Sequence, residues 1–122
     1  MCVTVDCYDP EPVARFWNDA LRWGGVALGE GGDGALCGPI DGGVYLEFVR
    51  VPEAKTVKNR LHLGLHAGTL AELEAEITRL VGLGASIAWE EEFPPDIAAR
   101  FRNVILRDPE GNEFCLGGGA LR

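Results

Sequence analysis

Two stretches of the chain carry apolar residues at helical spacing. In the first stretch, intervals of three and four residues place one set on a single helix face: Val13, Phe16, Trp17, Ala20 and Leu21. We expect this helix to begin after Asp9, which can cap it, and to tolerate Pro10 and Pro12 in its first turn. Gly24 is the expected stop.

The second helix has a clearer start. Thr69 and Glu72 form a capping-box pair, and the apolar stripe follows with Leu70, Leu73, Ile77, Leu80 and Val81. Gly84 is expected to end this helix.

The remaining segments read as strands separated by glycine- and proline-rich turns. Alternation and turn residues predict strands over residues 2–7, 25–28, 35–40, 44–51, 61–66, 86–92, 103–107 and 112–116. Residues 108–112, with the sequence Asp-Pro-Glu-Gly-Asn, predict a hairpin turn. The prolines near residue 94 predict a loop over 93–102, and residues 41–43 predict a further turn.

The order of elements repeats along the chain. A shift of 60 residues places Asp9 on Thr69 and Gly24 on Gly84, and a shift of 68 places residues 43–48 on 111–116. Each half is strand, helix and three strands, which is too small to bury both faces of its own sheet. The sequence predicts one α+β domain over residues 1–122: a βαβββ module over about 1–51, a linker over 52–60 and a second module over about 61–122. The two sheets are expected to form a curved sheet around a shared cavity.

Alternation within each strand predicts which side chains face this cavity. The large aliphatic side chains, including Leu61, Leu63 and Leu65, belong under the helices. The intervening positions give a polar lining: Cys2, Thr4, Asp6, Tyr45, Glu47, His62, His66, Glu113 and Cys115. Trp89 and Phe101 are candidate walls of a site, although aromatic residues serve equally well as core. Asp6, Glu47 and Glu113 are expected to crowd a partly apolar pocket, where desolvation and like-charge repulsion can raise the pKa of a carboxyl toward neutrality. Alternatively, one or two of them reach solvent, and Glu113, beside the hairpin, is the first candidate.

Composition narrows the classes of function. The formal charge of −8 is the wrong sign for a binder of nucleic acid, and a cation is the better guess for a charged ligand. The sequence has no apolar run long enough to span a membrane and no signal-peptide pattern at its start, which predicts a cytoplasmic protein without a membrane partner. Its four scattered cysteines form no CxxC pair, so reduced thiols are expected.

The paired βαβββ pattern resembles the vicinal oxygen chelate superfamily of glyoxalase I, extradiol dioxygenases and bleomycin-resistance proteins. The segments Asp9-Pro10 with Phe16-Trp17, residues 51–63 and residues 108–115 resemble its small glyoxalase-like bacterial subgroup. The resemblance implies metal-ligand positions at Cys2, Glu47, His62 and Cys115. Only Glu47 and His62 have the residue types that the family uses there, which argues against dioxygenase chemistry. These four residues suit a divalent metal such as zinc, nickel being the other candidate, but we favour a protein without a metal.

Two functions follow from the resemblance and the polar lining. The first is a glyoxalase-like lyase or isomerase that moves a proton next to a carbonyl, with Glu47 or Asp6 as base and His62 as partner. The alternative is a binding protein resembling bleomycin-resistance proteins, which traps a cationic small molecule without turnover. For His66 we favour a structural hydrogen bond near the strand end. The resemblance and the open sheet edges further predict a homodimer.

Overall fold

The computed structural model describes residues 1–39 and 42–121, which divide into two compact units, 1–56 and 57–122. The boundary between the units falls inside the predicted linker. Ile40 and Asp41, at the end of one predicted strand and the start of the next turn, lie outside the described residues. Among the described residues, none of the helices has the length and apolar character needed to cross a membrane.

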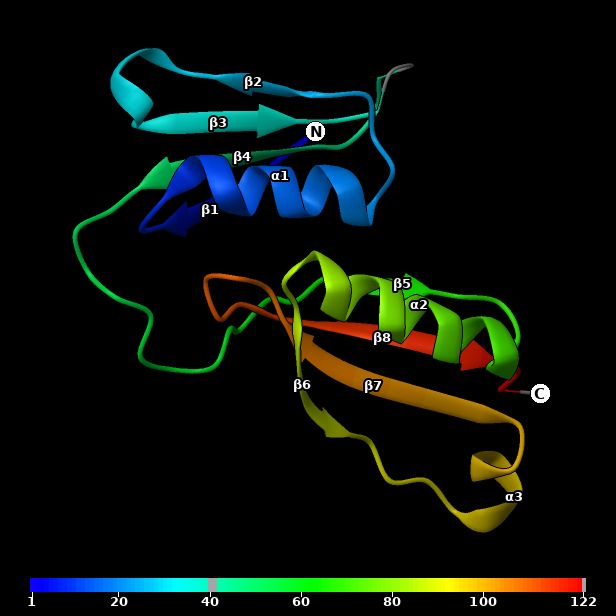
Figure 1. Ribbon diagram of the computed structural model, residues 1–122. Helices are drawn as coiled ribbons and strands as arrows, with labels where there is room; N and C mark the ends of the chain where they lie inside the picture. The colour runs from blue at the N-terminus through cyan, green and yellow to red at the C-terminus, as the bar shows by residue number, and fades with distance from the viewer. Residues whose placement is uncertain (40–41, 122) are drawn as a thin grey trace. The chain divides into compact units, whose positions relative to one another are not determined.

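The first unit is a βαβββ module. Its elements are β1 (Cys2–Cys7), α1 (Pro10–Ala20), β2 (Val26–Leu28), a 3-10 turn (Glu30–Gly32), β3 (Gly34–Cys37) and β4 (Tyr45–Arg50). The strands form one mixed sheet in the order β1-β4-β3-β2, in which β1 and β4 are parallel and the other pairs antiparallel. Figure 1 shows α1 lying along one face of this sheet.

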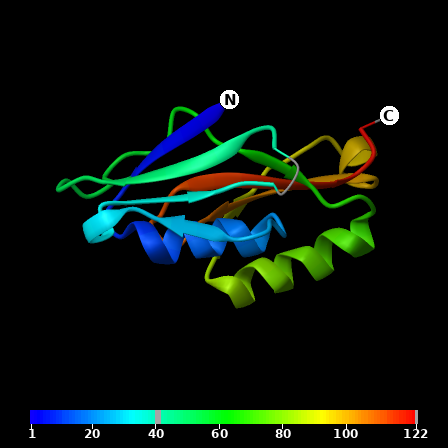
Figure 2. The same ribbon diagram turned by 90° about the horizontal axis from the view of Figure 1, so that it is seen from above.

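The second unit repeats this arrangement. Its elements are β5 (Gly64–His66), α2 (Leu70–Leu83), β6 (Ser86–Glu90), α3 (Pro95–Ala98), β7 (Phe101–Arg107) and β8 (Glu113–Gly119). The sheet order is β5-β8-β7-β6, again with one parallel pair, β5 with β8. In Figure 2 α2 lies along one side of its own sheet.

The strand register confirms the internal repeat at the level of single residues. Thr4 lies opposite Glu47 in the parallel pair of the first unit, and Gly64 lies opposite Cys115 in that of the second. Gly64 follows Thr4 by 60 residues and Cys115 follows Glu47 by 68, which are the two shifts read from the sequence. The predicted α+β fold of two βαβββ modules is therefore confirmed.

The predicted alternation is confirmed in the central strand of each sheet. On β4, Leu46 and Phe48 are fully buried, whereas Tyr45 is 41% exposed. On β8, Phe114 and Leu116 are fully buried in the same way. The helix-covered face of each sheet thus holds the core, and the opposite face, which we call the open face, carries the remaining side chains.

The end of α1 differs from the prediction. The helix stops at Ala20, before the expected stop at Gly24, and Arg22 takes the left-handed conformation with φ of 55°. The backbone N–H of Trp23 donates to the carbonyl of Asn18 at 2.8 Å, which closes the helix by a Schellman motif with arginine in the place of glycine. Asp9 is the N-cap residue, but its side chain makes no capping hydrogen bond.

The start and end of α2 agree with the prediction. The Thr69 hydroxyl accepts a hydrogen bond from the Glu72 backbone N–H at 3.1 Å. Gly84 closes the helix with φ of 123°, a conformation that disfavours any other residue.

Three predicted strand or loop limits in the second unit were wrong. Residues 93–102 contain the short helix α3 and the start of β7 rather than loop alone. The strand predicted over 61–66 is paired only from Gly64, and Leu61 is exposed rather than packed under α2. Conversely, β8 continues through Gly119, because a side chain at Gly118 would collide with Leu73 of α2 and only glycine allows this close packing.

Arg102 links α2 to the sheet of the second unit. Its guanidinium donates to Glu74 of α2 and, at 2.6 Å, to Glu90 of β6. The hydrogen bond from Arg102 lowers the pKa of the Glu90 carboxyl, so the stabilisation is present above the ordinary carboxyl pKa and is lost as pH falls through the lowered value.

We expect Arg102→Met to lower the free energy of unfolding by about 0.5–1 kcal/mol near neutral pH, a small effect because these groups are partly exposed. In acid, where Glu90 is protonated, the same substitution should cost nearly nothing. Urea unfolding at both pH values checks this, and an equal loss at both would contradict it.

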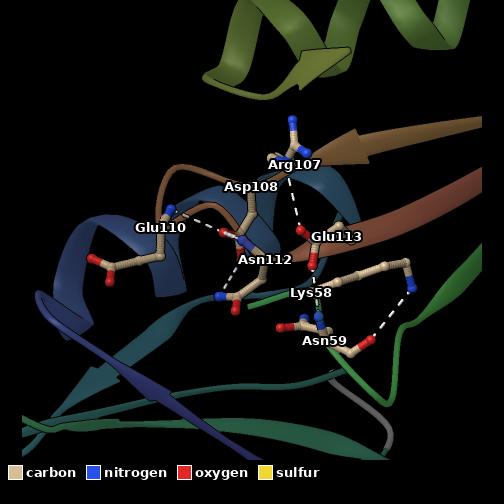
Figure 3. Close-up of polar contacts among 7 residues, drawn as sticks. All are labelled: Lys58, Asn59, Arg107, Asp108, Glu110, Asn112 and Glu113. Atoms are coloured by element: carbon tan, nitrogen blue, oxygen red, sulfur yellow. Dashed lines mark hydrogen bonds and ion pairs between the residues drawn. The ribbon is translucent and has the colours of Figure 1, made fainter. Parts of the chain in front are cut away.

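The predicted hairpin at residues 108–112 is confirmed, and a buried aspartate holds it together. Asp108 Oδ1 accepts hydrogen bonds from the backbone N–H groups of Glu110 and Asn112, both at 2.9 Å, as Figure 3 shows. Asn112 Nδ2 also donates to Asp108 Oδ2 at 3.2 Å. The side chain of Asp108 therefore replaces water around the turn.

Removal of this carboxylate should destabilise the second unit. We expect Asp108→Ala to lower the free energy of unfolding by about 2–3 kcal/mol, because two backbone donors lose a charged acceptor. Asp108→Asn, which keeps one acceptor oxygen, should lose about half as much. Denaturant unfolding of the two variants measures the difference, and equal stability of the alanine variant and the wild type would rule out this role.

Candidate functional site

The open face of the first unit carries a cluster of four polar side chains from β1 and β4. Thr4 Oγ1 donates to Glu47 Oε1 at 3.1 Å, and Cys2 Sγ lies 3.9 Å from the same hydroxyl. Tyr45 lies opposite Cys2 in the register, as Thr4 lies opposite Glu47. We call Cys2, Thr4, Tyr45 and Glu47 the first-unit polar cluster. The structure thus brings together four of the residues predicted for the lining.

The pKa of Tyr45 is raised above its ordinary value by its neighbours in this cluster. The charge of the Cys2 thiolate and a hydrogen bond to Cys2 raise the pKa of Tyr45, with smaller contributions from desolvation and from Glu47. The Tyr45 hydroxyl therefore keeps its proton throughout the neutral range and can act as a hydrogen-bond donor there.

The shift of Tyr45 can be measured directly. The chain has two tyrosines, so Tyr8→Phe leaves Tyr45 as the single phenol. In that background we expect Cys2→Ser to lower the pKa of Tyr45 toward its ordinary value, because the neighbouring negative charge is removed. Ultraviolet titration of tyrosinate formation checks this, and an unchanged titration curve would show that Cys2 is not the cause.

A pocket of about 480 Å³ adjoins the cluster within the first unit. Its lining comes from the segment leading into β2, from the end of β3 and from Tyr45. Leu36 of β3, which lies opposite Glu47, is also part of the lining. A Cβ at Gly38 would stand 2.8 Å from Tyr45 Cβ, so the absence of a side chain there keeps the space beside Tyr45 open. The pocket therefore places apolar surface next to the Tyr45 phenol, and its lining residue Leu36 is the strand neighbour of Glu47.

Asp6 shares the open face but not the cluster. It lies opposite Val49, two positions along β1 from Thr4, and is exposed. Among the described residues its carboxylate has no hydrogen-bond or ion-pair partner. Of the two candidate bases, Glu47 is therefore the one held in a defined orientation.

On the open face of the second unit, Cys115 has a glycine as its strand neighbour. Gly64 lies opposite Cys115, and a Cβ at Gly64 would meet Cys115 Sγ at 3.2 Å. His62 lies before β5 begins and is exposed. The chain first contacts β8 at the next residue, where the Leu63 carbonyl accepts a hydrogen bond from the Cys115 N–H. His66 Nδ1 accepts from the Gly68 N–H at 3.1 Å, the structural hydrogen bond expected for it.

The expectation that Glu113 reaches solvent was wrong. Glu113 is 5% exposed and is the neighbour of Arg107 across the β7–β8 pair. Its Oε1 accepts the backbone N–H of Asn59 at 2.8 Å, and its Oε2 lies 3.5 Å from Arg107 Nε (Figure 3). The connecting segment before β5 covers this carboxylate, which no pattern in the polar linker indicates.

Arg107 was missed by the sequence reasoning. Its guanidinium carbon lies 5.9 Å from the centroid of the Trp89 ring, in cation–π geometry. Alternation within β7 could have found it, because the pattern that buries Leu106 sends Arg107 to the open face. Phe101 packs edge-on against Phe93 and lies beside Gly117, so it lines the same face.

The cysteines show two environments. Cys7 and Cys37 are buried, and burial raises the pKa of the Cys37 thiol to about 11, so this group stays a neutral thiol. Cys2 and Cys115, at family ligand positions, are partly exposed.

The donor types differ from the ligand set that the family resemblance implies. Within the described part of either unit, no three histidine, cysteine, aspartate or glutamate side chains are grouped to hold a metal ion. In the first unit, Glu47 is oriented by the Thr4 hydroxyl. A thiol at Cys2 and another at Cys115 also replace the imidazole and carboxylate ligands that the family uses.

Two mixed four-stranded sheets, each a βαβββ module with one helix-covered and one open face, define the glyoxalase-like class of folds. The sequence matches the family described as Glyoxalase-like domain over residues 2–117, and the chain belongs to that family. The family places the protein among those that bind small molecules.

Solved structures share this fold at low sequence identity. The fosfomycin resistance protein FosX from Listeria monocytogenes superposes with a TM-score of 0.73 at 14% identity, covering 99% of this chain and 90% of that one. A glyoxalase/bleomycin resistance protein/dioxygenase family enzyme from Burkholderia phytofirmans PsJN has a TM-score of 0.70 at 14% identity, with coverages of 98% and 97%. Lactoylglutathione lyase from Agrobacterium tumefaciens superposes with a TM-score of 0.64 at 19% identity, covering 98% of this chain and 92% of that one. No curated protein matches the sequence.

Proposed function

We propose that the protein is a small-molecule enzyme of the glyoxalase-like type, a lyase or isomerase that moves a proton next to a carbonyl. The observation that carries this proposal is the orientation of Glu47 by Thr4 on the open face, next to Tyr45 and the pocket. A carboxylate fixed beside apolar surface is the arrangement that general-base catalysis requires.

The proposed step uses residues of the first-unit polar cluster alone. Glu47 takes the proton from the carbon next to the carbonyl, and the electron pair of that C–H bond moves to give an enolate. The Tyr45 hydroxyl donates a hydrogen bond to the enolate oxygen, since its raised pKa keeps it protonated. Glu47 then returns the proton to the same carbon, which restores the carbonyl compound and, in D2O, exchanges the proton for a deuteron. With an α-hydroxy carbonyl substrate, Glu47 instead protonates the former carbonyl carbon while the hydroxyl proton moves to the other oxygen, which gives the isomeric hydroxy carbonyl with atoms and charges balanced.

Proton exchange with solvent tests this step without knowledge of the natural substrate. The protein is incubated in D2O with a set of small carbonyl compounds, among them phenylpyruvate, and NMR follows the loss of the proton next to each carbonyl. We expect exchange above the buffer rate for at least one compound and a large loss in Tyr45→Phe. Exchange at the buffer rate for every compound would refute the proposal.

A second candidate function is binding without turnover, which the resemblance to bleomycin-resistance proteins implies. It is favoured by the thiols at two family ligand positions, Cys2 and Cys115, and by the charge of −8, which suits a cationic ligand. Calorimetry with a cationic aromatic compound such as benzamidine, at low and high salt, tests it. Salt-sensitive binding without proton exchange would favour this candidate over the enzyme.

Assembly and location are further parts of the proposal. We infer a homodimer from the unpaired edges of the sheets, for example β6, and from family resemblance. A cytoplasmic location agrees with the expected reduced thiols. Light scattering of the purified protein would refute the dimer if it gave the mass of a single chain.

A further inference from the structure

On the open face of the second unit, Arg107 is a charged residue that lies against an aromatic ring and is positioned by a buried partner. Glu113, itself pinned by the Asn59 N–H, faces the Nε atom of Arg107, and Trp89 flanks the guanidinium. These contacts restrict the rotation of a long side chain, so binding a ligand to it costs less conformational entropy. Arg107 is therefore held in place before any ligand arrives.

The contacts of Arg107 with Glu113 and Trp89 use its Nε atom and the face of its guanidinium, and they leave its terminal nitrogens available. Within the described part of the second unit, neither Nη1 nor Nη2 has a hydrogen-bond or ion-pair partner. The side chain is 43% exposed, and Figure 3 shows a terminal nitrogen turned away from Glu113. Two such N–H groups in a plane match a carboxylate or another oxyanion.

We propose that Arg107 binds the anionic group of a small-molecule ligand on the open face of the second unit, with Trp89 contacting an apolar or aromatic part next to it. Trp89 is 40% exposed, so ring surface remains for such a contact. The ligands expected at Arg107 are therefore small organic anions. This inference rests on the proposed function only in assuming that the protein binds a small molecule.

The overall charge of −8 does not oppose this assignment strongly. At physiological ionic strength, charges more than about 8 Å apart are largely screened, so the local guanidinium decides. Glu113 neutralises part of the charge of Arg107, but its carboxylate is turned to Asn59 and Nε and leaves the terminal N–H groups directional. The rival candidate of cation sequestration predicts the opposite ligand preference.

Three aromatic probes with the same ring test the proposal on the full-length protein. Benzoate is an anion, benzamide is neutral and benzamidine is a cation. NMR titrations of the ¹⁵N-labelled protein follow the tryptophan indole signals, with Trp89 assigned by Trp89→Phe. We expect benzoate to bind about tenfold more tightly than benzamide and to shift the Trp89 signal, because a charge-assisted hydrogen bond distinguishes them.

Variants at Arg107 isolate the guanidinium. Arg107→Gln should weaken benzoate binding about tenfold without changing that of benzamide. Arg107→Lys, which keeps the charge and a partner for Glu113, should retain part of the preference. Arg60→Gln removes an equal charge from the exposed linker and should change nothing.

The outcomes separate this inference from the proposed function. Equal affinity for benzoate and benzamide, a preference for benzamidine, an unshifted Trp89 signal, or full benzoate affinity in Arg107→Gln would each overturn the inference. Carbonyl exchange that persists in such a case would leave the proposed function standing. Arg107-dependent benzoate binding without carbonyl exchange would refute the proposed function alone.

Discussion

Replacement of Glu47 by glutamine is expected to slow proton exchange on a carbonyl substrate by about 10²–10⁴-fold, the usual contribution of a positioned general base. The amide is nearly the same size and can still accept a hydrogen bond from Thr4, so the open face should keep its shape. It has no basic oxygen to take the proton, and the effect should therefore fall on the chemical step rather than on binding. Exchange rates measured by NMR at saturating substrate give this number.

Two comparison variants make the result specific. Thr4→Val removes the hydroxyl that orients Glu47 and should cost about tenfold, a smaller loss than that of the base itself. Glu53→Gln removes an exposed carboxylate of the same unit outside the sheet and should leave exchange unchanged. An unaltered rate in Glu47→Gln, or an equal loss in Glu53→Gln, would remove Glu47 from the mechanism.

Truncation of Phe48 to alanine is expected to give a large loss of stability, about 3–5 kcal/mol. Phe48 is fully buried at the centre of β4, on the face covered by α1. Removing its ring leaves a cavity that the surrounding helix and sheet can fill only in part. Urea unfolding followed by circular dichroism measures the change.

The neighbouring residue on the same strand provides the control. Val49 points to the open face and is only partly buried, so Val49→Ala should cost about 1 kcal/mol or less. A loss for Val49→Ala equal to that for Phe48→Ala would mean that the two faces of β4 are not distinguished as core and open face.

The fold could be predicted from the sequence because its signals are local and occur twice. Apolar spacing at Val13, Phe16 and Trp17, and again at Leu73, Ile77 and Leu80, defined both helices without reference to the rest of the chain. Alternation around Leu46 and Phe48 then placed Tyr45 and Glu47 on the opposite face. Errors arose where backbone geometry overrode residue type, as at Arg22, which ends α1 in a conformation that usually belongs to glycine.

The candidate site was predicted less completely. Thr4 and Glu47 follow from alternation and strand pairing, so their proximity could be read from the repeat. The environments of Glu113 and Arg107 depend on where the connecting segment runs, and in particular on the Asn59 N–H, a backbone group that no side-chain pattern reveals. A charged residue beside a turn looks solvated in sequence whether or not another segment covers it.

Glu47 on the open face of the first unit is proposed to move a proton next to a carbonyl. The decisive measurement is deuterium incorporation into phenylpyruvate, which has an exchangeable carbon next to its carbonyl, followed by NMR for the wild type and Glu47→Gln in parallel. We expect exchange well above the buffer rate in the wild type and near the buffer rate in the variant, with both proteins folded. Equal rates in the two proteins, or no exchange above buffer in the wild type, would contradict it.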